Sequence, residues 1–148
     1  MKISTRGRYG LMAAVDLAMG GGEYKSLREI ARSQGLSEAY LEQLMAPLRK
    51  AGYVESARGA QGGYRLSRPP GEITAGEILK VLEGPMYPVD CVESGDGAGC
   101  GAADCESCAT KSLWVRLHDR MNDVLDSVSL EDLVRDYKEN DESRGVLL

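Results

Sequence analysis

The sequence predicts a mainly α-helical chain with one small β-hairpin and a long helix near its C-terminus. Apolar residues recur at three- and four-residue intervals over residues 4–50 and 109–134, as on one face of a helix. Two short alternating runs flank the glycine-rich segment 58–63, which is typical of a β-hairpin. Residues 86–108 are rich in Gly, Asp and Cys, show neither pattern, and are expected to be irregular.

The first predicted helix runs from Ser4 to about Gly20, where consecutive glycines end the run. Segment Ser26–Glu29 then has the form of a capping box, in which the serine hydroxyl and the glutamate carboxylate satisfy each other's backbone amides. This box predicts a short second helix that ends at Gly35. The apolar positions of the first helix are Leu11, Val15, Ala18 and Met19.

Ser37 is placed to cap a third helix, which Gly52 ends. Pro47 lies inside this helix and removes one backbone hydrogen bond, so we expect a bend or an irregularity there. The apolar face of the helix consists of Leu41, Leu44, Met45 and Leu48.

The second half of the chain begins after the hairpin strands, predicted at 53–56 and 64–66. Thr74 is placed to cap a short helix that Gly84 and Pro85 end. A long helix from about Ala109 to Ser127 follows, then a second short helix from Ser129 and a charged tail, 138–144, that we expect to fray. The apolar stripe of the long helix consists of Leu113, Trp114, Leu117, Met121, Val124, Leu125 and Val128.

Charge divides the chain into a basic and an acidic part. Residues 1–68 hold 11 Lys and Arg against 6 Asp and Glu, a net charge of +5, whereas the remainder holds 7 against 17, a net charge of −10. Because attraction to phosphates is screened within about 10 Å, a DNA-facing module joined to an acidic one would produce this division. Chance variation in surface charge would produce it too.

Two short helices separated by the turn at Gly35 and followed by a hairpin predict a winged helix-turn-helix, whose second helix lies in the major groove of DNA. Gln can pair with adenine, Glu can accept from cytosine, and Ala permits close approach. Each candidate could equally be an ordinary surface residue. The candidates on the third helix are Ala39, Gln43, Ala46 and Lys50, with Tyr40 and Glu42 at the margins and the capping Ser37 before them.

Arg58, beside Gly59 at the hairpin tip, is a stronger candidate because a lone Arg among small residues can enter a narrow minor groove. The glycines at this tip also satisfy turn geometry. Arg6, Arg8 and Tyr9 lie at the start of the first helix, near its positive dipole end, and are candidate phosphate contacts.

Four cysteines, Cys91, Cys100, Cys105 and Cys108, have the spacing C-x8-C-x4-C-x2-C. Four soft thiolates on one glycine-rich loop suit zinc or an iron–sulphur cluster. The spacing alone favours zinc at least as much, because Cys105 and Cys108 resemble half of a zinc knuckle. Thiol–disulfide exchange between these two cysteines and free thiols left from a lost site are competing interpretations.

Several motifs together resemble one known family. They are Lys2 to Gly10 (KISTRGRYG), Leu36-Ser37 with Tyr40 to Leu44, Arg58-Gly59 with Gly62 to Tyr64, and Ile78 with Val81 to Gly84. From Met1 to about Val134 the chain resembles the Rrf-two family of winged helix-turn-helix transcription regulators. The resemblance implies a homodimer held by the long helix, a winged-helix domain at each end, and recognition of palindromic operators in double-stranded DNA.

The resemblance also favours a cofactor. Cluster-binding members carry three cysteines just before the long helix, and some add a His three residues after the third. Aligned on Trp114, Cys108 matches the third cysteine and Lys111 takes the His position. The resemblance therefore implies an iron–sulphur cluster, 2Fe-2S ahead of 4Fe-4S, held by the four cysteines or by three of them with a residue of the partner subunit. Zinc stays the alternative metal.

Other members of the family imply a regulator without a cluster, cofactor-free or zinc-binding, that is controlled by thiol redox state or by a partner enzyme of cysteine metabolism. A thiol oxidoreductase using segment 105–108 fits less well, because no nucleophile–base pair accompanies it and His118 lies in the long helix as a solvated or packed residue. We therefore expect no enzyme.

The domain prediction has four parts: a winged helix-turn-helix domain (1–84), a cysteine-rich cluster-binding loop (85–108), a dimerisation helix with the following short helix (109–137), and a charged tail (138–148). No apolar run approaches the roughly 18 residues of a membrane span, and the polar N-terminus lacks a signal core. We expect a cytoplasmic protein without a membrane partner.

Overall fold

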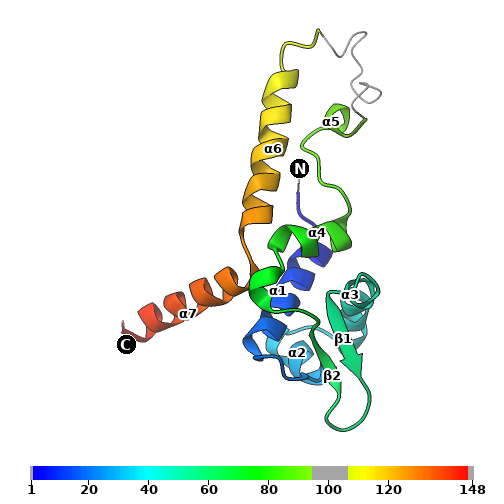
Figure 1. The fold of residues 1–148 in the computed structure, drawn as a ribbon, viewed down its shortest axis with the longest axis vertical. Helices are drawn as coiled ribbons and strands as arrows, with labels where there is room; N and C mark the ends of the chain where they lie inside the picture. The colour runs from blue at the N-terminus through cyan, green and yellow to red at the C-terminus, as the bar shows by residue number, and fades with distance from the viewer. Residues whose placement is uncertain (1, 95–106, 147–148) are drawn as a thin grey trace.

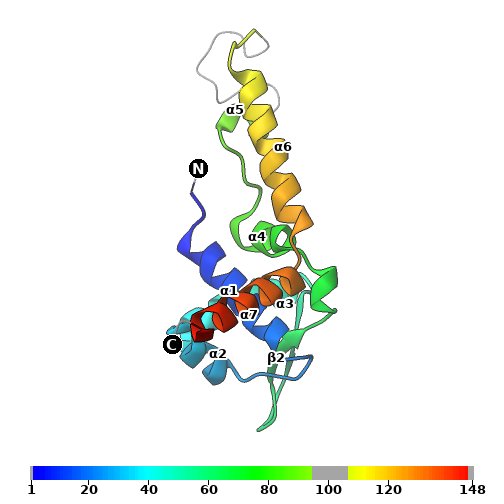
Figure 2. The same ribbon diagram turned by 90° about the vertical axis from the view of Figure 1, so that its left-hand side faces the viewer.

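The computed structural model describes residues 2–94 and 107–146. Figures 1 and 2 show α1 to α4 and the hairpin as one body, from which α6 and α7 extend in different directions. The predicted fold class, mainly α with a small β-wing, is confirmed. The elements are α1 (Thr5–Met19), α2 (Leu27–Gln34), α3 (Glu38–Lys50), β1 (Val54–Ala57), β2 (Gly63–Leu66), the 3-10 turn η1 (Pro70–Glu72), α4 (Ala75–Glu83), α5 (Asp90–Ser94), α6 (Lys111–Ser127) and α7 (Leu130–Val146).

Side-chain caps set the starts of the predicted helices. The Ser26 hydroxyl accepts from the Glu29 amide at 3.1 Å, and the Glu29 carboxylate accepts from the Ser26 amide at 3.0 Å. Thr74 and Glu77 form the same reciprocal pair at α4. These bonds satisfy amides that have no partner within the helix, which is why short polar motifs located the helix starts correctly.

Helix α3 runs without interruption across Pro47, so the predicted irregularity does not break it. The carbonyl that loses its helical partner is that of Gln43. Gln43 lies on the exposed face, where water can satisfy this carbonyl.

Helix α1 is central to the hydrophobic core and packs against α2, α3, α4, α7 and β2. The corner between α6 and α7 joins this core, because Leu130 is fully buried and its amide donates to the Ile73 carbonyl at 2.9 Å. The Ala75 amide donates to the Val128 carbonyl at 2.8 Å from the other side. The C-terminal end of α6 is therefore fixed to the start of α4, while α6 itself buries no residue.

The hairpin pairs antiparallel, from Val54 opposite Leu66 to Ala57 opposite Gly63. Its base is extended by Lys25, whose amide and carbonyl both bond to Tyr64 at 2.8 Å. Gly63 has φ of 139°, and a Cβ there would lie 2.1 Å from the Lys25 carbonyl oxygen. Glycine is therefore required where the hairpin meets the chain before α2.

A buried ion pair fastens the same junction. Asp16, only 2% exposed, lies on α1 and its carboxylate pairs with the Lys25 ammonium. The second carboxylate oxygen accepts from the Gln34 amide at 3.4 Å. One side chain thus ties α1 to α2 and to the base of the hairpin.

Asp16→Ala is expected to lower the free energy of unfolding by about 2 kcal/mol, because it leaves a partly buried ammonium and an amide without their acceptor. Urea denaturation measures the change. Asp16→Asn keeps an acceptor and should lose less, and Glu23→Ala, in the exposed loop after α1, should change nothing. Equal stability of Asp16→Ala and wild type would show that the pair does not fasten the junction.

Two predictions about the second half of the chain are wrong. Segment 86–108 is not irregular throughout, because it contains α5. Residues 138–144 do not form a frayed tail, because α7 continues through them to Val146. Helix α7 begins at a capping pair, Ser129 with Asp132, and contains three Glu, two Arg and one Lys, residues that favour helix over frayed coil.

The capping pair makes α7 sensitive to acid. Hydrogen bonds from the backbone amide and the hydroxyl of Ser129 hold the pKa of Asp132 below its ordinary value. A lowered folded pKa stabilises the helix above the unfolded pKa, near 4, and that contribution is lost as the pH falls through the folded value.

Among the helices that the structure describes, none is long and apolar enough to cross a membrane.

Candidate nucleic-acid interface and cysteine pocket

Helices α2 and α3 form the predicted helix-turn-helix. Gly35 ends α2 in the left-handed conformation, with φ of 66°, and Ser37 caps α3 two residues later by accepting from the Tyr40 amide at 3.1 Å. The turn is tight because a glycine reverses the chain and a serine restarts the helix.

The two faces of α3 divide as the sequence predicts. The four residues assigned to the apolar face are at most 1% exposed and pack in the core. Tyr40 is half-buried, and its ring meets that of Tyr9 edge-on, with centroids 6.4 Å apart. The remaining candidates are exposed and lie on one face: Ser37, Ala39, Glu42, Gln43, Ala46 and Lys50.

Arg58 and Gly59 are exposed at the tip of the hairpin. Within residues 2–94 and 107–146, no carboxylate pairs with Arg58, with Lys50, or with the exposed Arg6 and Arg8. Arginines with open guanidinium groups on one module are available to an anionic partner.

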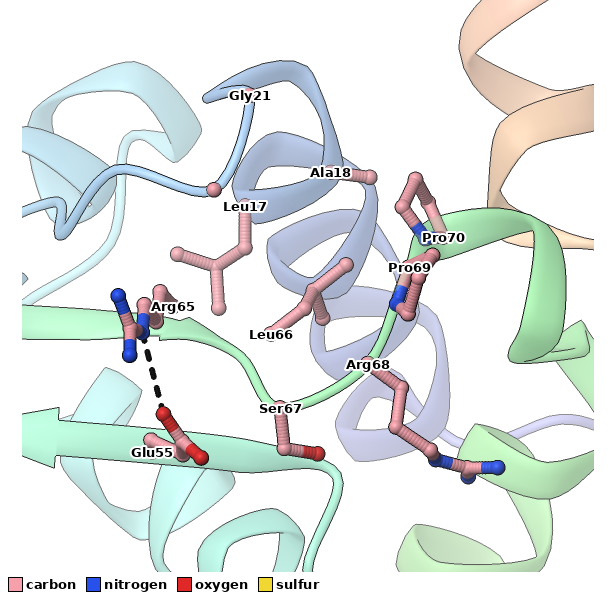
Figure 3. Close-up of a pocket in the computed structure, with 11 residues that line it drawn as sticks. Leu17, Ala18, Gly21, Glu55, Arg65, Leu66, Ser67, Arg68, Pro69 and Pro70 are labelled. Atoms are coloured by element: carbon pink, nitrogen blue, oxygen red, sulfur yellow. Dashed lines mark hydrogen bonds and ion pairs between the residues drawn. The ribbon is translucent and has the colours of Figure 1, made fainter.

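Other arginines of the module are already engaged. Arg65 pairs with Glu55 at 3.1 Å and lies over the Tyr24 ring, and Arg68 pairs with Glu77 at 3.7 Å. Both line a cavity of 420 Å³ between the end of α1 and the chain after β2, where Figure 3 shows the bond from Arg65 to Glu55. This cavity is a poor anion site, because a ligand would have to displace a carboxylate from either arginine.

The start of α1 differs from its predicted setting. Arg6 and Arg8 are exposed and Tyr9 is half-buried. The positive end of the helix is not open, however, because the Glu83 carboxylate accepts from the amides of Ser4 and Gly7, each at 3.0 Å. A phosphate near this turn would meet arginine side chains rather than free amides.

Helix α6 splits its apolar stripe between two faces. Trp114, Met121 and Leu125 are half-buried toward the chain's own α4 and α5 side. Leu113, Leu117 and Val124 are 55%, 45% and 61% exposed. The most exposed edge of the stripe is therefore Leu113–Leu117–Val124, and pairing of subunits through the long helix stays a prediction.

Two of the four candidate ligands lie at one cavity of 440 Å³ between α5 and the start of α6. Cys91, 8% exposed, comes from α5, and Cys108 precedes α6 with its Sγ 3.5 Å from the Thr110 hydroxyl. Trp114 lines the same cavity. Cys100 and Cys105 lie outside the described residues, and among those described no three His, Cys, Asp or Glu side chains are arranged to hold a metal.

His118 is a packed residue. Its ring stacks on Tyr87 with centroids 4.9 Å apart and an interplanar angle of 18°. Tyr87 and Glu83 are contacts that the sequence did not reveal, because neither belongs to a spacing pattern that predicts a partner distant in the chain.

Comparison with known proteins places the chain in a family. The family model Rrf2, described as an iron-dependent transcriptional regulator, matches residues 3–136. The transcriptional regulator CymR of Bacillus subtilis is 51% identical over 134 residues, 90% of this chain and 89% of that protein. Its structure, described as that of the global cysteine regulator, has a TM-score of 0.78 at 48% identity and covers 91% of this chain and 97% of its own.

Regulators named IscR are similar as well. The protein from Cereibacter sphaeroides is 39% identical over 91% of this chain and 88% of its own length. The structure of T. potens IscR has a TM-score of 0.74 at 44% identity and covers 95% of this chain and 90% of that one. These relatives are transcriptional regulators, in agreement with the expectation that the chain is not an enzyme. The chain belongs to the Rrf2 (Rrf-two) family of winged-helix transcription regulators.

Proposed function

We propose that the protein is a dimer that binds a palindromic operator through α3 and the β1–β2 wing, and that an iron–sulphur cluster held by the cysteine segment sets its affinity for DNA. The observation that carries the DNA-binding part is the polar, exposed face of α3 next to a wing whose Arg58 has no carboxylate partner among the described residues.

The assigned roles follow from chemistry. Gln43 and Glu42 reach base edges in the major groove, and Ala39 and Ala46 allow the helix to approach closely. Arg58 enters the minor groove. Lys50, Arg6 and Arg8 contact phosphates, which set the position of the protein on DNA rather than its sequence preference.

The stripe Leu113–Leu117–Val124 supports a dimer. Three large apolar side chains on one side of a helix that buries no residue would be costly in water for a monomer. Their spacing of four and seven residues suits an antiparallel or parallel pair of helices. A second copy of α6 covers them most simply, and places two winged domains on one duplex.

The cavity with Cys91 and Cys108 supports the cofactor. Two thiols from different elements at one cavity fit half of a four-thiolate ligand set, and Cys100 and Cys105 would supply the rest. A bound cluster would give the protein a centre that responds to oxidants or nitric oxide. The cavity adjoins the first turn of α6, so ordering or displacing the cysteine segment would change how α6 is held. The distance between the two winged domains would change with it, and that distance has to match the half-site separation of about 34 Å for one turn of DNA.

A second candidate is a regulator without a cluster, controlled by thiol redox state or by an enzyme of cysteine metabolism. The observation that favours it is the higher identity to CymR, described as a cysteine regulator, than to the IscR proteins. In this version Cys91 and Cys108 respond as thiols, with or without zinc.

Anaerobic purification followed by analysis of iron, acid-labile sulphide and zinc separates the two candidates. The cluster proposal predicts a coloured protein with about two iron and two sulphide per chain, or about four of each for the larger cluster. A colourless protein with stoichiometric zinc, or with no metal, would reject the cluster and favour the second candidate.

DNA binding is tested by selection of duplexes from a random-sequence library with the purified protein. The expected product is an inverted repeat with half-sites about one helical turn apart. Failure to enrich any sequence at low salt would reject the proposed sequence-specific binding to DNA.

Arg58→Ala is expected to weaken binding to the selected duplex about tenfold and to reduce the salt dependence of log Kd by about one charge. Fluorescence anisotropy at several salt concentrations measures both. Arg65→Ala is the matched control, since Arg65 lies on the same hairpin but is paired with Glu55 and Tyr24. Unchanged affinity of Arg58→Ala across salt would show that the wing tip does not touch DNA.

A further inference from the structure

Glu83 joins two parts of the chain that the proposed function uses separately. It is the last residue of α4, and its Oε1 accepts from the backbone amides of Ser4 and Gly7 at 3.0 Å and from the Ser4 hydroxyl. Three donors on one carboxylate oxygen make Glu83 an external cap for α1, supplied from residues distant in the sequence.

Gly7 has no side chain and therefore leaves room for the Glu83 carboxylate. The residue is buried, and a Cβ there would lie 2.1 Å from Glu83 Oε1. Any larger residue at this position must therefore displace the carboxylate. The close approach explains a glycine within the first turn of a helix, where glycine is otherwise unfavourable.

The turn that Glu83 holds carries the candidate phosphate contacts. Arg6 and Arg8 flank Gly7 and are exposed. Tyr9 follows and meets Tyr40 at the start of α3 edge-on, at 6.4 Å. Displacing this turn would therefore move two arginines and would remove the support of the first residues of α3.

On its other side Glu83 adjoins the cysteine segment. Gly84 ends α4 with φ of 75°, and the chain leads from there to Cys91. Helix α4 also touches α6, because Lys80 pairs with Asp126 at 3.0 Å. Helix α4 therefore lies between α6 and the first turn of α1.

We propose that Glu83 is a positioning residue for DNA binding, which holds the first turn of α1 in register with α3. This inference rests on the proposed function. Simple charge predicts the opposite effect of removing Glu83, since one fewer carboxylate near phosphates strengthens binding. The direction of the change is therefore diagnostic.

The test compares Glu83→Ala, Glu83→Gln, Gly7→Ala and the double variant Gly7→Ala/Glu83→Ala in full-length protein, with the selected duplex as probe. Glu83→Ala is expected to weaken binding about tenfold, roughly 1.4 kcal/mol, and to lower the salt slope, because Arg6 and Arg8 lose their placement. Glu83→Gln keeps an acceptor and should recover most of the affinity. Gly7→Ala should weaken binding similarly, but add little in the double variant.

The control is Glu23→Ala, which removes an exposed carboxylate from the loop after α1. It should leave affinity unchanged or slightly tighter. Circular dichroism verifies that every variant is folded at the assay temperature.

Each outcome decides between the alternatives. Unchanged or tighter binding by Glu83→Ala overturns the role of Glu83. Weaker binding with an unchanged salt slope and additive single effects also overturns it, because it shows general destabilisation. If wild type binds no duplex, the proposed function itself fails, and the role of Glu83 fails with it.

Discussion

Leu117→Asp is expected to convert the proposed dimer into a monomer of one 16.0 kDa chain and to weaken binding to the selected duplex at least about a hundredfold. Leu117 is 45% exposed in the middle of the stripe Leu113–Leu117–Val124, on a helix that buries no residue of its own. A carboxylate placed there is solvated in the monomer but desolvated, and close to its symmetry mate, in a helix pair. The two winged domains then bind independently.

Analytical ultracentrifugation measures the mass, and anisotropy with full and half-site duplexes measures the affinity. Ser112→Asp introduces the same group on α6 five residues earlier, on a different side of the helix, and should remain dimeric. Affinity for a single half-site should be unaffected in both variants. A dimeric Leu117→Asp would show that subunits associate through another surface.

Cys108→Ser is expected to abolish stable cofactor binding, with less than about a tenth of the wild-type iron retained, because a serine hydroxyl is a poor ligand at neutral pH for a site built from thiolates. Cys91→Ser should have the same effect, since both thiols line one cavity. Iron, sulphide and visible absorbance after anaerobic purification measure the loss.

Thr110→Val is the matched control for the cysteine variants. Thr110 lines the same cavity and its hydroxyl lies 3.5 Å from Cys108 Sγ, so the substitution disturbs the cavity without removing a thiol. It should retain the cofactor. Full iron content in both Cys→Ser variants would place the cluster on other residues.

Local signals account for what the sequence could predict. The pairs Ser26 with Glu29 and Thr74 with Glu77 act over three residues, so their motifs located helix starts directly. The apolar spacing of α3 likewise predicted which residues are buried, and hence which face is available to DNA. The glycine cluster between the strands marked the hairpin because a turn, too, depends on residues that are neighbours in the sequence.

Contacts between distant residues account for the errors. Leu113 and Trp114 lie at the two edges of the stripe on α6, about 100° apart around the helix. Only packing against α4 and α5 shows which edge the chain itself covers. Helix α7 exceeds its prediction because the Lys, Glu and Arg residues of 138–144 have high helix propensity, while this stretch has no apolar face and so gives no periodic signal. Glu83 is separated from Ser4 by most of the winged domain, and the motif that contains it, Val81 to Gly84, gives no sign of this contact.

The most direct test of the account is the affinity of one protein preparation for the selected duplex with and without its cofactor. Anaerobically purified protein and the same sample after removal of metal by a chelator are titrated in parallel, with dimer mass verified in both. Control by the cysteine segment predicts Kd values that differ at least about tenfold, roughly 1.4 kcal/mol. Equal Kd values, with the cofactor present in one sample and absent from the other, would contradict it.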